Sequence, residues 1–214
     1  MTRPLRIEYK NAVYHVMNRG QDGRDIFVNE QDYQNFICAI QEAYRHWEIQ
    51  VYAYCLMQNH YHLCMETPEG NLSRVMRHID GVYTQRFNRT HHKDGPIFRG
   101  RYKAIIIDAE EYLGQVVRYI YLNPVKAKIV EEPAHYSWCS HREYLTRKHR
   151  IQWMKTERLL ENFGGAKGFN AYVMAGNSEE AERFYGKKKQ TIIFGGDEFI
   201  EKIKERGEEP LLEH

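Results

Sequence analysis

The sequence predicts an α+β fold: an antiparallel sheet with helices on one face, followed by a mostly helical C-terminal extension. Two observations predict it. Apolar residues alternate with a period of two in four short segments, and they recur with helical spacing in three longer segments. Over the first 130 residues the resulting order is strand, helix, strand, strand, helix, strand, helix. That order is typical of a ferredoxin-like fold extended by one helix.

Each element has its own local signal. A polar pair, Gln58 and Asn59, separates two strand-like runs and predicts a hairpin turn. Pro124 is expected to end the third helix or to stand just beyond its end. The predicted strands are residues 13–19, 49–57, 60–67 and 98–108, and the predicted helices are residues 29–47, 71–89 and 110–122.

Beyond residue 130 the hydrophobic pattern weakens, so we divide the chain into residues 1–130 and an extension, residues 131–214. Helices are predicted in the extension at residues 156–163, 178–185 and 197–206. The closing Leu212, Glu213 and His214 match the beginning of a purification tag. The extension is therefore expected to be mainly helical, with an end that can be tag-derived.

Composition narrows the function classes. The chain is 42% hydrophobic and 28% charged, has no apolar run of membrane-spanning length and shows no signal-peptide core, so we expect a cytoplasmic protein. Its four cysteines form no Cys-x-x-Cys pair and are expected to be reduced. The net charge is only +2, yet residues 71–103 carry eight basic side chains against two acidic ones. Such a local excess indicates a polyanionic partner such as nucleic acid.

Two histidines, His60 and His62, stand two positions apart on a predicted strand and therefore project from the same face. Neutral imidazoles on one face can form two-thirds of a divalent-metal site, although a buried histidine is often a core residue. His15 joins them if its strand lies beside theirs; otherwise it is a structural imidazole. Tyr119 on the third helix can act as a nucleophile beside a metal, and Asn123 would share its helical face. In a chain with 16 tyrosines, packing is the competing role for Tyr119.

Four motifs in this order resemble the signature of the IS200-like single-tyrosine transposases, which are His-hydrophobic-His enzymes. The similarity is greatest to the branch associated with repetitive extragenic palindromes (REPs). The motifs are YHVMNRG at residues 14–20, MQNHYHL at 57–63, RGRYKA at 99–104 and RYIYLNPVKA at 118–127.

The resemblance implies that residues 1–130 form a transposase-like catalytic domain. It implies metal-dependent cleavage and strand transfer of single-stranded DNA at a hairpin, through a 5′-phosphotyrosine intermediate. By motif, Tyr119 would be the nucleophile, and His60, His62 and Asn123 would bind Mg²⁺ or Mn²⁺. The wider family often has Gln at the position of Asn123, which is one methylene shorter and precedes Pro124. Gln115, one turn before Tyr119, is therefore the alternative third ligand. Tyr112, two helical turns before Tyr119, is the substitute nucleophile.

Basic side chains are expected to hold DNA phosphates, while Tyr83 and Phe87 can either stack on bases or belong to the core. The expected DNA-binding residues are Arg74, Arg77, Arg86 and Arg89 on the second helix and Arg99, Arg101 and Lys103 on the fourth strand. By alternation, the last three would share one strand face. The alternative function is a catalytically silent regulator that binds DNA or RNA hairpins. A homodimer is compatible with either function.

Overall fold

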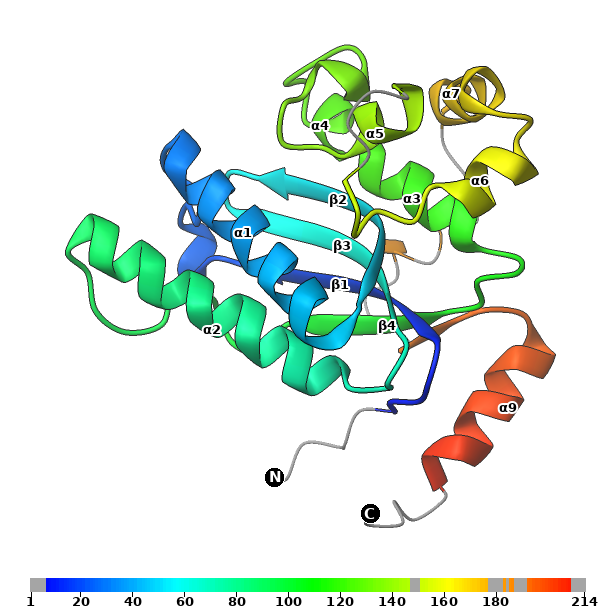
Figure 1. The fold of residues 1–214 in the computed structure, drawn as a ribbon, viewed down its shortest axis with the longest axis horizontal. Coiled ribbons are helices and arrows are strands. Elements are labelled where there is room, and N and C mark those ends of the chain that lie inside the picture. The colour runs from blue at the N-terminus through cyan, green and yellow to red at the C-terminus, as the bar shows by residue number, and fades with distance from the viewer. Residues whose placement is uncertain (1–6, 147–150, 177–182, 184, 187–191, 209–214) are drawn as a thin grey trace.

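The computed structural model describes residues 7–146, 151–176, 183, 185, 186 and 192–208 (Figure 1). Within these residues, five strands form one mixed sheet in the order β2-β3-β1-β4-β5. The strands are β1 (Ala12–Arg19), β2 (Gln50–Met57), β3 (His60–Thr67), β4 (Lys103–Ile107) and β5 (Ile193–Phe194). The helices are α1 (Glu30–Trp47), α2 (Leu72–His91), α3 (Leu113–Tyr121), α4 (Asn123–Lys126), α5 (His141–Leu145), α6 (Glu157–Asn162), α7 (Ala166–Met174) and α9 (Asp197–Glu208), with short 3₁₀ turns η1 (Gln21–Gly23) and η2 (Pro133–His135). The predicted α+β fold is confirmed.

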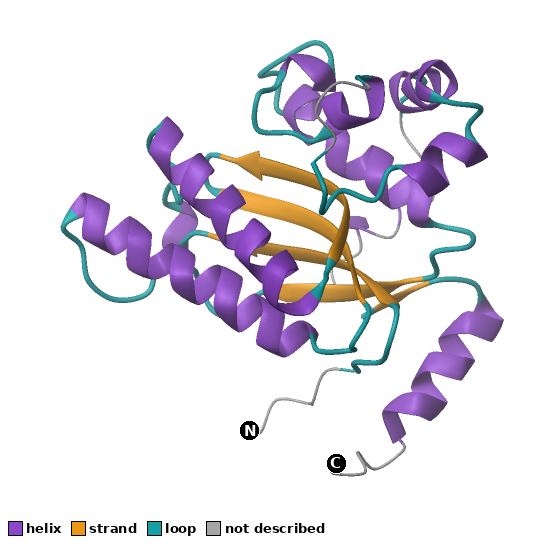
Figure 2. Ribbon diagram, in the orientation of Figure 1, coloured by secondary structure: helices purple, strands orange, loops and turns teal. Residues whose placement is uncertain are grey.

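The first four strands are antiparallel to their neighbours, and β5 adds to β4 in parallel. Because β3 lies between β1 and β2, and β1 lies between β3 and β4, α1 and α2 each cross over one strand. Right-handed crossovers place two such helices on the same face of a sheet. Figure 2 shows α1 and α2 together on one face. The strand β5 was not predicted, because two residues are too few to show a period.

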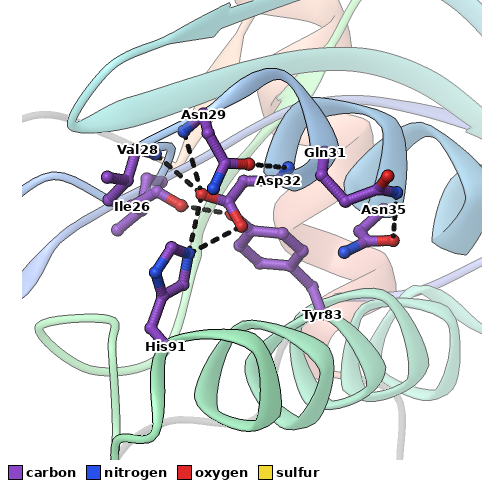
Figure 3. Close-up of polar contacts among 8 residues, drawn as sticks. All are labelled: Ile26, Val28, Asn29, Gln31, Asp32, Asn35, Tyr83 and His91. Carbon is purple, nitrogen blue, oxygen red and sulfur yellow. Dashed lines mark hydrogen bonds and ion pairs between the residues drawn. The ribbon is translucent and has the colours of Figure 1, made fainter.

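The beginning of α1 is fixed by a buried carboxylate (Figure 3). Asn29 caps the helix through its side chain, and Asp32 accepts the backbone N–H groups of Val28 at 2.8 Å and of Asn29 at 3.1 Å. His91, the last residue of α2, places Nε2 at 2.9 Å from both carboxylate oxygens of Asp32. This capping box explains why α1 begins where the sequence predicts, and it ties the start of α1 to the end of α2.

The main core lies between the sheet and these two helices. Alternate residues of β3, including Tyr61 and Leu63, point into it and are fully buried. From α2, Tyr83 is 0% exposed and Phe87 is 2% exposed. Both are core residues, so the interpretation that they stack on DNA bases is wrong.

The extension covers the outer edge of β2. Backbone hydrogen bonds join Val51 to Trp153 at 2.8 Å and Leu56 to Trp138 at 2.9 Å. Further bonds join Ser140 to the carbonyl of Tyr54 and Lys155 to that of Val51. Residues beyond 130 thus supply the hydrogen-bond partners that an edge strand would otherwise leave open.

The predicted helices of the extension at residues 156–163 and 197–206 are α6 and α9. Most of the predicted helix at residues 178–185 and the tag-like residues 212–214 lie outside the described residues. Helices α5 and α7 were not predicted, because α5 has only five residues and a glycine interrupts the pattern of α7. Among the described residues, none of the helices combines the length and apolar character needed to cross a membrane.

Candidate active site

The two histidines of β3 lie side by side on the face of the sheet opposite α1 and α2. Their ring centroids are 5.1 Å apart and the rings are perpendicular. His62 is 6% exposed, and His60 is half-buried. On the other face, Tyr61 between them donates its hydroxyl to Asp80 of α2 at 2.7 Å. The shared face of His60 and His62, predicted from alternation, is thus present in the structure.

Hydrogen bonds to Nδ1 leave Nε2 as the ligating nitrogen of both rings. Nδ1 of His60 is 2.7 Å from Oδ1 of Asn59, whose Nδ2 donates to the carbonyl of Gly23 at 3.4 Å. Since an amide oxygen only accepts, Nδ1 of His60 carries the proton and Nε2 keeps its lone pair. Nδ1 of His62 is 2.9 Å from Nε2 of His15.

These imidazoles are neutral at neutral pH. Burial lowers the pKa of His60 below its ordinary value. Burial, followed by the neighbouring His15 and His60, lowers the pKa of His62 well below 6.5, and burial alone lowers the pKa of His15 to about 3. A neutral imidazole is the form that binds a metal, so the donor set fits a divalent cation.

Tyr119 reaches the same site from α3, which contacts β2 and β3. Its ring centroid is 6.0 Å from that of His62 and 6.0 Å from that of His15. Helix α3 thus covers part of the sheet face opposite α1 and α2, where no helix was predicted, and it brings Tyr119 to the histidines. Tyr112, at the start of α3, packs its ring 4.6 Å from that of Phe194 in β5. The geometry favours Tyr119 over Tyr112 as the nucleophile.

Asn123 does not lie on one continuous helix with Tyr119. Helix α3 ends at Tyr121, and α4 begins with Pro124 in its first turn. Nδ2 of Asn123 donates to the carbonyls of Tyr119 at 2.9 Å and Ile120 at 3.2 Å, so it caps the end of α3. Its amide oxygen is then the atom suited to a metal.

Gln115 lies one turn before Tyr119 on α3. Within the described residues, no three His, Cys, Asp or Glu side chains gather in a way that could hold a metal. The choice between Asn123 and Gln115 stays a prediction.

Lys126 places a cation beside Tyr119, with its Nζ 4.9 Å from the centroid of the Tyr119 ring. Arg118 instead places its guanidinium 4.2 Å from the ring of Tyr172 on α7. Sequence reasoning missed Lys126, although a helical spacing of seven residues would already place it on the same face as Tyr119. A further clue in the sequence was that Lys126 lies within the motif of residues 118–127.

Two basic residues share the histidine face. Lys103 on β4 is opposite Met17, which is opposite His62, so all three lie in one row across the sheet. Arg19, which sequence reasoning also missed, is exposed and directly opposite His60. Alternation within β1 shows which of its side chains share a face. Placing Arg19 opposite His60 also requires the register between β1 and β3.

Arg99 and Arg101 are exposed and precede β4, which begins at Lys103 rather than at residue 98. They therefore do not share a strand face with Lys103, contrary to the prediction. The backbone N–H of Arg99 donates to the carbonyl of Arg19 at 3.0 Å, which keeps this loop at the Arg19 end of β1.

The arginines of α2 lie on the opposite side of the sheet from the histidines. Arg86 forms an ion pair with Glu42 of α1 at 2.6 Å, and Arg74 lies over the ring of Trp47. Arg77 and Arg89 are exposed. These four residues form a surface separate from the His60–His62–Tyr119 site.

Comparisons with known proteins agree with this geometry. The sequence model of the family described as "Transposase IS200 like" matches residues 8–123, more than half of the chain. A protein of Haemophilus influenzae named as a REP-associated tyrosine transposase is 26% identical over 147 residues, covering 63% of this chain and 78% of the relative. A REP-associated tyrosine transposase solved bound to a REP hairpin has a similar fold. Its TM-score is 0.59 at 21% identity, over 72% of this chain and 90% of the other. The chain therefore belongs to the IS200-like transposase family, as its four motifs predict.

Proposed function

We propose that this protein is a metal-dependent single-tyrosine transposase, which cleaves and rejoins single-stranded DNA beside a hairpin. The observation that carries the proposal is the convergence of His60, His62 and Tyr119 on one face of the sheet. Binding alone does not need this combination. Membership of the IS200-like family supports the same reading.

In the proposed reaction, His60 and His62 would hold Mg²⁺ or Mn²⁺, with Asn123 or Gln115 as the third protein ligand. Such an ion would supply Lewis-acid polarisation of a phosphate oxygen. Tyr119 attacks phosphorus through its phenolate oxygen and forms a phosphotyrosine with the 5′ end of the downstream strand. The bond to the 3′ oxygen of the upstream strand breaks, and that oxygen takes up a proton. Rejoining reverses these steps, with a 3′-hydroxyl displacing Tyr119.

Lys126 is the residue proposed to favour the phenolate. A tyrosine hydroxyl has an ordinary pKa of about 10, so forming its anion needs positive charge nearby. The ammonium of Lys126 lies over the Tyr119 ring and can supply it. Arg118, the sequence neighbour of Tyr119, is directed to Tyr172 instead.

The cleaved strand is proposed to cross the histidine face, where Arg19 and Lys103 flank the site and Arg99 and Arg101 extend its rim. The arginines of α2 lie on the far face, so they can contact only DNA that continues around the molecule, such as the hairpin stem. The relative solved with a REP hairpin supports hairpin-bearing DNA as the partner. A homodimer, where one forms, would need a surface other than the covered edge of β2.

We further propose that residues 1–130 carry out the DNA cleavage and that residues 131–214 support the site. The reaction is proposed to take place in the cytoplasm, where chromosomal DNA is available. The extension holds the edge of β2 and contributes Tyr185, whose ring stacks on that of Tyr119 at 4.1 Å.

The test is a covalent-adduct assay. The protein is incubated with Mn²⁺ or Mg²⁺ and hairpin oligonucleotides from the palindromes of its host, carrying single-stranded flanks. Denaturing gels then show which DNA end stays with the protein. A 5′-phosphotyrosine retains a 3′-end label and releases a 5′-labelled fragment, so the two labels report the polarity of cleavage.

Tyr119→Phe is expected to abolish the adduct, whereas the matched variant Tyr112→Phe retains it. The opposite pattern would assign the nucleophile to Tyr112. Tight hairpin binding without any adduct, from protein shown to bind the metal, would instead establish the silent hairpin-binding regulator.

A further inference from the structure

A buried hydrogen-bond chain continues outward from the metal-binding histidine His62. Nδ1 of His62 is 2.9 Å from Nε2 of His15, and Nδ1 of His15 is 2.6 Å from the hydroxyl of Tyr185. His15 is 0% exposed, so water does not substitute for either partner. The three side chains come from β3, β1 and the extension, and no local pattern links them.

We propose that His15 and Tyr185 are positioning residues that set the tautomer of His62 and thereby decide whether its Nε2 can bind a metal. This inference rests on the metal site of the proposed function. It assigns a role in that site to a residue of the extension.

The hydrogen-bond chain from His62 to Tyr185 can run in either of two directions, because each neutral imidazole has one donor and one acceptor nitrogen. In the first, Nδ1–H of His62 donates to His15, and Nδ1–H of His15 donates to the Tyr185 oxygen. Nε2 of His62 then keeps its lone pair and can bind a metal. In the second, the Tyr185 hydroxyl donates to His15, and His15 donates to His62. Nε2 of His62 then carries a proton and cannot bind.

Tyr185 makes both directions available, because a phenolic hydroxyl can either donate or accept. His60 differs, because the amide oxygen of Asn59 can only accept a hydrogen bond. The proton of His60 therefore stays on Nδ1, and Nε2 keeps the lone pair that binds a metal. The site therefore combines one fixed ligand, His60, with one conditional ligand, His62. A metal ion selects the first direction, and groups behind a ligating histidine commonly affect metal affinity by about 10- to 100-fold.

Three variants test this chain. His15→Leu removes both hydrogen bonds and is expected to weaken Mn²⁺ binding by about 10- to 100-fold. His15→Gln restores an acceptor for Nδ1–H of His62 and is expected to recover most of the affinity. Tyr185→Phe leaves His15 in place and is expected to give an intermediate loss. Free Mn²⁺ is measured by electron paramagnetic resonance.

Tyr14→Phe is the matched control, because Tyr14 is the neighbour of His15 on β1 but faces the other side of the sheet, where its hydroxyl bonds the carbonyl of Ile7. Its Mn²⁺ affinity is expected to equal that of the wild type. Urea unfolding of every variant checks that each is folded.

A second measurement does not depend on activity or on Mn²⁺. Long-range ¹H–¹⁵N spectra of histidine-labelled protein with Mg²⁺ report which ring nitrogen of His62 carries the proton. We expect Nδ1–H in the wild type and in His15→Gln, and a loss of this preference in folded His15→Leu.

The outcomes separate the two proposals. A wild-type protein that binds neither Mn²⁺ nor Mg²⁺ would overturn the metal site and this inference with it. Unchanged Mn²⁺ affinity in both His15→Leu and Tyr185→Phe, in a protein whose wild type binds Mn²⁺, would overturn this inference and leave the metal site standing. Nε2–H on His62 with Mg²⁺ bound would overturn this inference and also remove His62 from the proposed ligands, because a protonated nitrogen has no lone pair for a metal.

Discussion

His141, at the start of α5, should make the protein less stable in mild acid. Its side chain is 0% exposed and packs against Tyr121 and Phe169, with ring centroids 5.0 and 6.1 Å away. Among the described residues, neither of its ring nitrogens has a hydrogen-bond partner. Burial lowers its pKa from 6.5 to about 4. The folded protein therefore holds this imidazole neutral where an unfolded chain would protonate it.

The direction and size of the change in the free energy of unfolding with pH follow from proton linkage. Between pH 6.5 and pH 4 the unfolded state binds more protons at His141 than the folded state, so the free energy of unfolding falls as the pH falls. Each pH unit inside this window removes about 1.4 kcal/mol, and less near its ends. Lowering the pH from 7 to 4.5 should thus remove about 2 kcal/mol through His141 alone.

The assay compares wild type with His141→Leu by urea unfolding at pH 7 and at pH 4.5. Leucine has a similar volume and no titrating group, so the variant should lose about 2 kcal/mol less over this range. At pH 7 it should be at least as stable, because two unpartnered nitrogens are removed from the interior. All other titrating groups, including His15, are common to both proteins. An equal pH-dependent loss in both proteins would refute the reasoning.

Three further outcomes are expected. Lys126→Ala should slow adduct formation by about 2- to 30-fold, the factor equal to ~0.5–2 kcal/mol of Coulombic stabilisation of the phenolate over the neutral hydroxyl, and Lys126→Arg should restore most of the rate in single-turnover assays. Arg19→Ala should weaken binding of an unpaired oligonucleotide and lower the salt slope by about 1 in fluorescence titrations, whereas Arg77→Ala on the far face should leave both unchanged. Asp32→Ala should lower the free energy of unfolding in urea by about 3 kcal/mol, because the buried carboxylate serves two backbone N–H groups and His91; a change below about 1 kcal/mol would contradict this role.

Local patterns predicted the elements of the sheet domain well. The predicted strand at residues 60–67 is β3, and the helix predicted at 71–89 is α2, which runs from Leu72 to His91. The shared face of His60 and His62 also followed from sequence, because strand alternation is a property of the backbone itself. The signal failed where an element was short or bent. Strand β4 begins only at Lys103, and the chain turns between Tyr121 and Asn123.

Strand register lay beyond the local pattern. Arg19 faces His60, and His15 reaches His62, only because β1 pairs with β3 in one particular alignment. That alignment depends on hydrogen bonds and packing between segments far apart in the chain. The hydrophobic pattern of either strand alone does not encode it.

The sequence by itself determined the family, the α+β fold and the components of the candidate site: two histidines on one strand face and Tyr119 on the helix that follows the last long strand. These depend on motif order and backbone periodicity, which are local. Only the tertiary structure decided which groups surround them. It placed Lys126 over Tyr119, turned Asn123 back onto α3, put the arginines of α2 on the far face and joined His62 to His15 and Tyr185. Such neighbours are chosen by packing across the whole chain, and so a single sequence does not reveal them.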